Sequence, residues 1–350
     1  MTTSTIVAAD PLTDEAWLGL ACTPRASLFT SPPWINAVCG TYGFTPRSVV
    51  AVDHRGEPTG GFAWVTIDDA RGTRACSLPF SDRADPLVDD ETGWRSLFDA
   101  ADLGTAHPYA LRCLDDSPAV ADPRLRITSE AAWHGTPLDA TPDELYRRIS
   151  SASRRAIAVS ERAGVRVEVR TDVDAVRSFH RLHVRLRKKK YRLLAQPMEF
   201  FERIWREFAP SDRINTLLAC FRDEVIAGAV FLEWNGAFYY KFGASAAEHL
   251  AFRPNDAIYW TGIRCAIERG LGLVDWGLSD LDQPGLVAFK RKWASTERRL
   301  LTLRAGMRAP RPEQVRFASE LSELTRLLTD ETVPDAITTQ AGALLYRYFC

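Results

Sequence analysis

The segment Gly272–Trp293, with the sequence G-L-V-D-W-G-L-S-D-L-D-Q-P-G-L-V-A-F-K-R-K-W, holds the most informative order of features in the chain. Its apolar beginning predicts a short strand that breaks at Gly277. Acidic and turn-forming residues follow at 279–285, and an aromatic–basic run, F-K-R-K-W, occupies 289–293. Carboxylates at a strand end can orient an amine, and a lysine beside a bulky aromatic side chain can stabilise an oxyanion. The segment is therefore a candidate for orienting an amine and stabilising an oxyanion.

The second half of the chain, outward from this segment, has a regular order of elements. The Asn235-Gly236 pair between two apolar stretches predicts a hairpin. Hydrophobic periodicity predicts helices at 174–187 and 197–208 and strands at 216–222, 225–234 and 237–243. It then predicts a helix at 255–269 and a strand at 273–276.

The first half is rich in strands. A hairpin is expected from strands at 49–52 and 60–65, followed by a helix at 94–103. Thr141 begins a further helix, because a threonine N-cap precedes a proline and two acidic residues. A basic helix at 154–163 ends at Gly164, and the alternating residues 165–169 form a strand.

Gly164 therefore marks the expected domain boundary. We expect an N-terminal domain at 1–164 and a C-terminal catalytic domain at 165–309. Residues 310–350 form a helical tail packed on the second domain, with one helix at 312–328.

The composition is that of a soluble globular protein, with 350 residues, 46% hydrophobic and 25% charged. This length suits two ordinary domains. No apolar run approaches the roughly 20 residues that span a bilayer, and residues 1–6 lack the regions of a signal peptide. We therefore expect a cytoplasmic protein. The net charge of −1 gives no overall attraction to nucleic acid.

The cysteines and histidines point away from nucleophilic and metal chemistry. The seven cysteines are scattered and form no C-x-x-C pair, which indicates reduced thiols in the core rather than a catalytic cysteine. Among the six histidines, only His180 and His183 share a helix. Their spacing permits a metal ion, but no third ligand accompanies them, so we expect surface or capping polarity and no metal.

Four stretches resemble those of the Fem-type aminoacyltransferases and their relatives in the GNAT superfamily. Three are L-P-F-S-D at 78–82 with D-P-L at 85–87, S-R-R-A-I at 153–157 with A-G at 163–164, and Q-P at 196–197 with Phe200, Phe201 and Trp205. The fourth is a C-terminal core of F-G-A-S at 242–245, R-P-N-D at 253–256, D-W-G at 275–277 and F-K-R-K-W at 289–293. The resemblance implies an α/β (α+β) fold of tandem GNAT-like domains, each a mixed, mostly antiparallel central sheet flanked by helices.

The resemblance also implies an enzyme that forms an amide bond by direct transfer, with no covalent enzyme intermediate and no bound cofactor. The preferred donor is aminoacyl-tRNA, and the acceptor amine belongs to a cell-wall precursor or to a specialised metabolite. Two departures qualify this picture. The acetyl-CoA signature Q/R-x-x-G-x-G/A is missing and R-P-N-D stands in its place, and the coiled-coil arm of some Fem enzymes is missing.

Two other functions remain open on the sequence alone. One is an acyl-CoA- or acyl-carrier-dependent N-acyltransferase in polysaccharide or lipid assembly. The other is a non-catalytic binding protein with a GNAT fold. The sequence gives neither the acceptor nor the oligomeric state.

Lys290 is the first candidate for oxyanion stabilisation, with Phe289 shaping the pocket; the alternative is a solvated helix start. Asp280 and Asp282 could orient the amine or take its proton, and the alternative is turn formation. The candidates for substrate binding are Tyr240, Lys241, Arg253, Asp256, Asp82, Arg154 and Arg155, of which Tyr240 could instead be core and Asp256 a helix-start residue. The candidates for phosphate or tRNA contacts are Arg187, Lys188, Lys189 and Lys190, which could instead form a solvated face.

Overall fold

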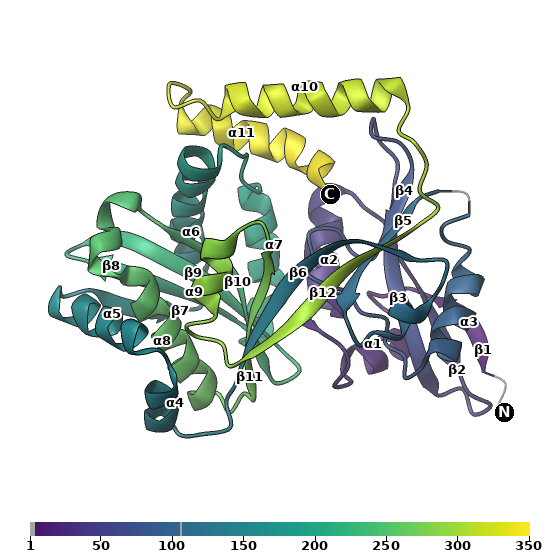
Figure 1. The fold of residues 1–350 in the computed structure, drawn as a ribbon, viewed down its shortest axis with the longest axis horizontal. Coiled ribbons are helices and arrows are strands. Elements are labelled where there is room, and N and C mark those ends of the chain that lie inside the picture. Colours follow the sequence, from purple (N-terminus) through teal and green to yellow (C-terminus); the bar gives the residue numbers. More distant parts are fainter. Residues whose placement is uncertain (1–3, 106) are drawn as a thin grey trace. The chain divides into compact units, whose positions relative to one another are not determined.

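The computed structural model describes residues 4–105 and 107–350, which form two compact units. The first unit comprises Met1–Ala132, Arg298–Ser319 and Cys350. The second comprises Trp133–Glu297 and Glu320–Phe349. Each unit is a mixed α/β structure built on its own strands and helices (Figure 1).

This division differs from the one expected at Gly164. Helices α4 (Pro142–Arg148) and α5 (Ser151–Arg162) belong to the second unit, because their apolar side chains are buried in the cluster that covers its sheet. Strand β12 (Thr296–Ala305) returns to the first unit, where it pairs antiparallel with β5 (Tyr109–Leu114). Chain order could not predict this return, because it depends on pairing between distant segments.

The first unit has the strand order β1-β2-β3-β4-β5-β12. Its remaining strands are β1 (Thr5–Ala9), β2 (Pro46–Val52), β3 (Pro58–Ile67) and β4 (Arg74–Cys76). The pairs β1–β2, β2–β3, β3–β4 and β5–β12 are antiparallel, and β4–β5 is parallel. Helix α3 (Glu91–Ala101) packs with Phe62 and Trp64 on one face, while α1 (Glu15–Ala21) approaches Gly61 on the other. Helix α2 (Pro32–Tyr42) begins at the Ser31 cap.

The second unit has the strand order β6-β11-β10-β9-β8-β7. These strands are β6 (Arg126–Pro137, in this unit from Trp133), β11 (Leu273–Asp280), β10 (Ala237–Ser245), β9 (Glu224–Trp234), β8 (Ile214–Phe221) and β7 (Arg166–Arg170). The β7–β8, β8–β9 and β9–β10 ladders are antiparallel, and the β10–β11 ladder is parallel. The sheets are therefore mixed and mostly antiparallel, as predicted.

Helices cover both faces of the second sheet (Figure 1). Side chains alternate along a strand, so neighbouring residues of β9 face opposite sides. Phe231 lies in the apolar cluster with α5 and α8 (Pro254–Glu268), whereas Gly228 faces Phe179 of α6 (Val173–Leu186). Helix α7 (Met198–Phe208) packs beside α6.

Several local predictions are confirmed. The order α6-α7-β8-β9-β10-α8-β11 is the one the sequence predicts. Thr141 forms a capping box with Glu144, and Asn235 and Gly236 both have the positive φ of the expected hairpin turn. The tail holds α10 over the predicted residues, Pro312–Leu328, followed by α11 (Asp335–Leu345), which contacts α6.

One prediction about the strand at Gly277 is wrong. Strand β11 continues to Asp280, and Gly277 lies within it at a φ of 70°. The backbone amide of Gly277 donates to the Asp275 carboxylate (2.7 Å), which holds this conformation. A residue with a Cβ would be strained there, so the glycine bends the strand rather than ending it.

No helix in residues 4–105 and 107–350 is long and apolar enough to cross a membrane.

Candidate functional site

The second unit opens its sheet between β10 and β11. The two strands form a parallel ladder only where Ala237–Tyr239 pairs with Leu273–Asp275. Strand β10 nevertheless continues to Ser245, and β11 continues to Asp280. Beyond this point the two strands are no longer partners. The separated ends form a wedge in the sheet, defined here as Tyr240–Ser245 of β10 and Trp276–Asp280 of β11.

Tyr240 lies at the start of the wedge because β10 is irregular there. The register with β9 shifts between Tyr240 and Phe242, and the Tyr240 hydroxyl lies over Gly243, where a Cβ would clash with it. Tyr259 of α8 donates a hydrogen bond to the Tyr240 hydroxyl (2.8 Å). Burial raises the pKa of Tyr240 to about 12, so this pair stays protonated at neutral pH. Tyr240 thus belongs to the wedge rather than only to the core.

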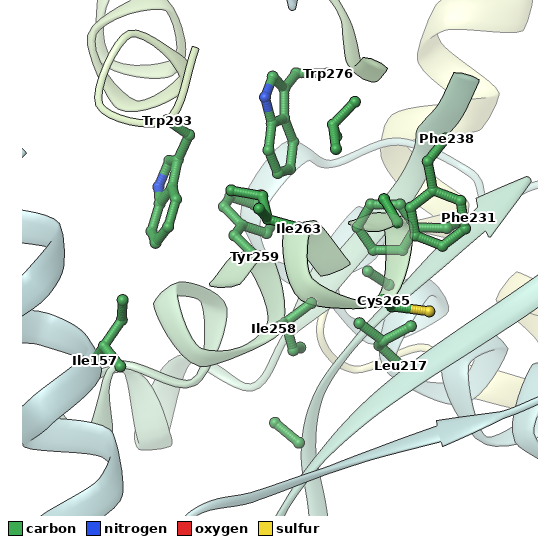
Figure 2. Close-up of a cluster of buried hydrophobic side chains, with 14 of the residues drawn as sticks. Ile157, Leu217, Phe231, Phe238, Ile258, Tyr259, Ile263, Cys265, Trp276 and Trp293 are labelled. Carbon is green, nitrogen blue, oxygen red and sulfur yellow. The ribbon is translucent and has the colours of Figure 1, made fainter. Parts of the chain in front are cut away.

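Aromatic rings line the side of the wedge that faces α8. Figure 2 shows Tyr259 between the indoles of Trp276 and Trp293, with ring centroids 5.1 and 5.7 Å away. Phe289, on α9 (Pro284–Lys290), lies 5.2 Å from Tyr259. Three elements, α8, β11 and α9, therefore bring their aromatic residues to one place, where they exclude water from a reacting group.

Lys290 lies at the separated end of β11. Its side chain is buried, with 7% of the residue exposed, and its Nζ donates to the backbone carbonyl of Leu278 (2.6 Å). The positive charge of Lys290 also contributes to lowering the pKa of the buried His134, after desolvation as the main cause. Lys290 is therefore a fixed, desolvated cation and not part of a solvated helix start.

Asp256 occupies the first turn of α8, three residues before Tyr259, so both side chains lie on the same face of the helix. Burial raises the pKa of this carboxyl to about 6, and the charges of Arg253 and Lys292 partly oppose that rise. Asp280 and Asp282 are instead exposed, and the Asp280 carbonyl accepts from the Gln283 amide (3.0 Å), as in an ordinary turn. Among these carboxylates, Asp256 is the half-buried one.

The start of α8 is a poor cradle for a pyrophosphate. Pro254 at its first position has no N–H, and the backbone amide of Asp256 faces its own carboxylate. Arg253, the N-cap, is exposed and adopts the left-handed conformation with a φ of 57°. The negative charge of Asp256 would repel an anion at this helix end, although helix N-termini generally attract anions.

The other proposed substrate residues lie apart in the structure or have local roles. Arg154 donates to the carbonyls of Arg147 (2.8 Å) and Ile149 (2.5 Å), so it caps the end of α4. Arg155 is exposed on α5, and the Nζ of Lys241 lies 5.6 Å from the ring of Phe242. Asp82 belongs to the first unit.

The basic stretch after α6 is only partly available to a ligand. A π-helical turn (Arg187–Tyr191) turns Lys188 inward, where it is 3% exposed and its Nζ donates to Asp335 (2.8 Å) and to the Val333 carbonyl. Arg187 donates to the Leu194 carbonyl (3.1 Å). The expectation of four phosphate-binding residues is therefore wrong for Lys188 and weakened for Arg187, which leaves Lys189 and Lys190 exposed.

We expect the double variant Lys189→Gln, Lys190→Gln to flatten the salt dependence of donor binding by about one to two units of slope, because each phosphate contact releases counterions. Its unfolding midpoint should not change, since exposed charges contribute little to stability. The matched variant Lys188→Gln should leave the salt dependence unchanged and lower the unfolding midpoint, because it leaves buried partners unsatisfied. The measurement is donor binding as a function of salt concentration. Parallel slopes for the wild type and the double variant would show that these lysines only form a solvated face.

The cysteine and histidine side chains offer little nucleophilic capacity. Burial raises the pKa of Cys39 and Cys76 to about 12, far from a thiolate at neutral pH. The Nε2 atoms of His180 and His183 lie 2.9 and 2.7 Å from the backbone and side-chain oxygens of Gln196, and burial lowers both pKa values. Both rings therefore serve the packing of α6.

The sequence alone did not single out Tyr259 and Lys292 as neighbours of Asp256, nor Trp276 and Trp293 as neighbours of Tyr259. Only the i, i+3 spacing of Asp256 and Tyr259 could have been read in advance, since it places both on one helix face. The other three come from β11 and from the segment around α9, and their meeting depends on tertiary packing.

The comparisons with known proteins agree with this architecture. Residues 146–291 match the family model described as the acetyltransferase (GNAT) domain. FemX is similar in structure, with 16% identity, 84% of this chain and 96% of that chain covered, and a TM-score of 0.65. No curated protein sequence matches the chain.

Two further solved structures share the fold. A tandem GNAT protein from the clavulanic acid biosynthesis pathway is 15% identical over 88% of this chain and 100% of that one, with a TM-score of 0.52. The C-terminal domain of a putative lysylphosphatidylglycerol synthetase from Agrobacterium fabrum is 13% identical over 82% and 90%, with a TM-score of 0.50. Residues 146–291 therefore correspond to an acetyltransferase (GNAT) domain, and the chain shares the fold of FemX and of the tandem GNAT protein.

Proposed function

We propose that this protein is an N-acyltransferase that forms an amide bond, with aminoacyl-tRNA as donor and a small or nucleotide-linked amine as acceptor. The observation that carries the proposal is the wedge between β10 and β11, with the buried Lys290 ammonium at its β11 end and the Tyr240–Tyr259 pair at its β10 end. The fold-level likeness to FemX and to the putative lysylphosphatidylglycerol synthetase favours an aminoacyl group. A cytoplasmic location is part of this proposal.

The reaction is a direct substitution at the acyl carbon. The amine nitrogen attacks the ester carbonyl, the carbon–nitrogen bond forms, and the negative charge that develops on the carbonyl oxygen lies beside Lys290. The carbon–oxygen bond then breaks, the nitrogen loses one proton, and the departing sugar oxygen gains a proton and becomes a hydroxyl. A desolvated cation about 4 Å from such an oxyanion contributes on the order of 4 kcal/mol at an effective dielectric constant near 20.

Dependence on charged tRNA tests the proposal. Purified protein would be incubated with radiolabelled amino acids, total aminoacylated tRNA and an extract that supplies acceptors, and the products identified by mass spectrometry. We expect a labelled amide product that ribonuclease treatment abolishes. A product that survives ribonuclease would instead support transfer from acyl-CoA or an acyl carrier, the second candidate that the acetyltransferase family match favours.

Calorimetry with acetyl-CoA separates the two donors directly. We expect no binding tighter than about 1 mM, equivalent to roughly 4 kcal/mol, because Pro254 removes a donor from the start of α8 and Asp256 places a negative charge there. Desulfo- or adenine-nucleotide fragments serve as controls for non-specific anion binding. Micromolar affinity for acetyl-CoA would overturn the tRNA preference and promote the second candidate.

A further inference from the structure

The carboxylate of Asp256 is unusual among the charged groups of the second unit. Within the described residues it makes no ion pair and no side-chain hydrogen bond, and only its own backbone amide faces it. It is half-buried in the first turn of α8, a place where an acidic residue commonly only caps the helix. Here the N-cap is Arg253, with no side-chain cap hydrogen bond, so capping does not account for the burial of Asp256.

The surroundings of Asp256 come from several elements. On its own helix the neighbours are Arg253 and Tyr259, and the cation of Lys292 reaches it from the segment after α9. The Nζ of Lys292 lies 5.8 Å from the ring of Phe289, which in turn contacts Tyr259. Strand β10 contributes the Tyr240 hydroxyl through Tyr259.

Helix α5, which also packs along α8, carries Arg154, whose guanidinium donates to the carbonyls at the end of α4, and Arg155, which is exposed. Asp256 therefore shares a helix face with Tyr259, whose ring lies against Phe289 of α9, the helix that ends at Lys290.

We propose that Asp256 is the catalytic base that takes the proton from the attacking amine, with Lys292 as a positioning residue that keeps the carboxylate ionised. This role rests on the proposed acyl transfer and applies to either donor. A carboxylate that is half-buried, unpaired and on the same helix face as Tyr259 is poised to accept a proton and to hold an ammonium before it reacts. The exposed Asp280 and Asp282 lack that environment.

The proton balance is simple. The amine nitrogen loses one proton to an Asp256 oxygen as the carbon–nitrogen bond forms. The donor's carbon–oxygen or carbon–sulfur bond breaks, and the leaving oxygen or sulfur receives a proton from Asp256 or from water. No oxidant, reductant or metal ion takes part in these steps.

The experiment is a pH profile of kcat/KM for the wild type and three variants, with whichever donor supports transfer. In the wild type, activity should rise with pH through about 6, since only the ionised carboxylate can accept a proton. Asp256→Asn should lower kcat/KM by about 10²–10⁴-fold and remove the rise with pH, the acid limb of the profile. Asp256→Glu should recover part of the rate. Lys292→Met should move the limb to higher pH, because the loss of a nearby cation raises the carboxyl pKa.

Asp223→Asn, at an exposed carboxylate outside the wedge, is the matched control, and it should keep both the rate and the acid limb of the profile. The shift in Lys292→Met separates Asp256 from the acceptor amine, whose own titration does not depend on Lys292. Normal turnover in Asp256→Asn, or an acid limb that stays in place in Lys292→Met, would overturn this role while leaving the acyl transfer intact. Absence of transfer with both donors would instead overturn the proposed function, and the role with it.

Discussion

Lys290→Met should lower kcat by about 10²–10³-fold while the protein remains folded, the usual result of removing one oxyanion-stabilising donor. The Leu278 carbonyl holds the ammonium in place before substrate binds, so the charge needs no reorganisation during the reaction. Methionine keeps the length and apolar stem of the side chain but removes the cation. Steady-state kinetics with saturating donor and acceptor gives the decisive value.

Two comparisons make this result specific to Lys290. Arg291→Gln changes the neighbouring cation, which is exposed and paired with Glu297 (2.6 Å), and it should alter kcat by less than about threefold because exposed pairs contribute little. Lys290→Arg should retain part of the activity. Loss of the Leu278 hydrogen bond should destabilise the methionine variant by about 1 kcal/mol, which thermal unfolding would report. A methionine variant with near-normal turnover would remove Lys290 from the mechanism.

Trp276→Ala should destabilise the second unit by about 3–5 kcal/mol, the typical effect of deleting a large buried aromatic side chain. Trp276 is 1% exposed and packs against Tyr240 and Tyr259, so its removal leaves a cavity at the base of the wedge. Its indole N–H also donates to the Thr136 hydroxyl (2.8 Å), which donates to the Trp293 carbonyl (2.7 Å). Urea unfolding followed by circular dichroism measures the change in midpoint.

Trp276→Phe serves as the graded control for this prediction. It keeps most of the ring volume but loses the hydrogen bond, so we expect a loss of about 1–3 kcal/mol. Trp260→Ala, which truncates a half-buried tryptophan on the Tyr146 side of α8, should cost less than Trp276→Ala. Equal unfolding midpoints for the Trp276→Ala variant and the wild type would contradict the central place of this residue in the apolar cluster.

Local patterns determined the identity and order of the elements. The capping box at Thr141, the hairpin at Asn235-Gly236 and the periodicity of α10 depend on residues within a few positions of one another, so each can be read along the chain. The motif at 289–293 likewise indicated Lys290 and Phe289 before their neighbours were known. The fold class follows from that order because few sheet topologies accommodate it.

Only the tertiary structure determined the features that depend on contacts between distant segments. The unit boundary moved from Gly164 because α4 and α5 pack on the second unit, and residues 298–319 rejoin the first unit, where β12 pairs with β5. Such contacts between distant segments leave little trace in either segment alone. Lys188 and Lys190 look alike in sequence, yet the π-helical turn buries one and exposes the other. Asp256 and Asp280 are both acidic residues at element ends, yet Asp256 is half-buried and Asp280 is exposed. Burial raises the pKa of Asp256, because desolvation depends on what surrounds a group in space and not on its neighbours in the chain.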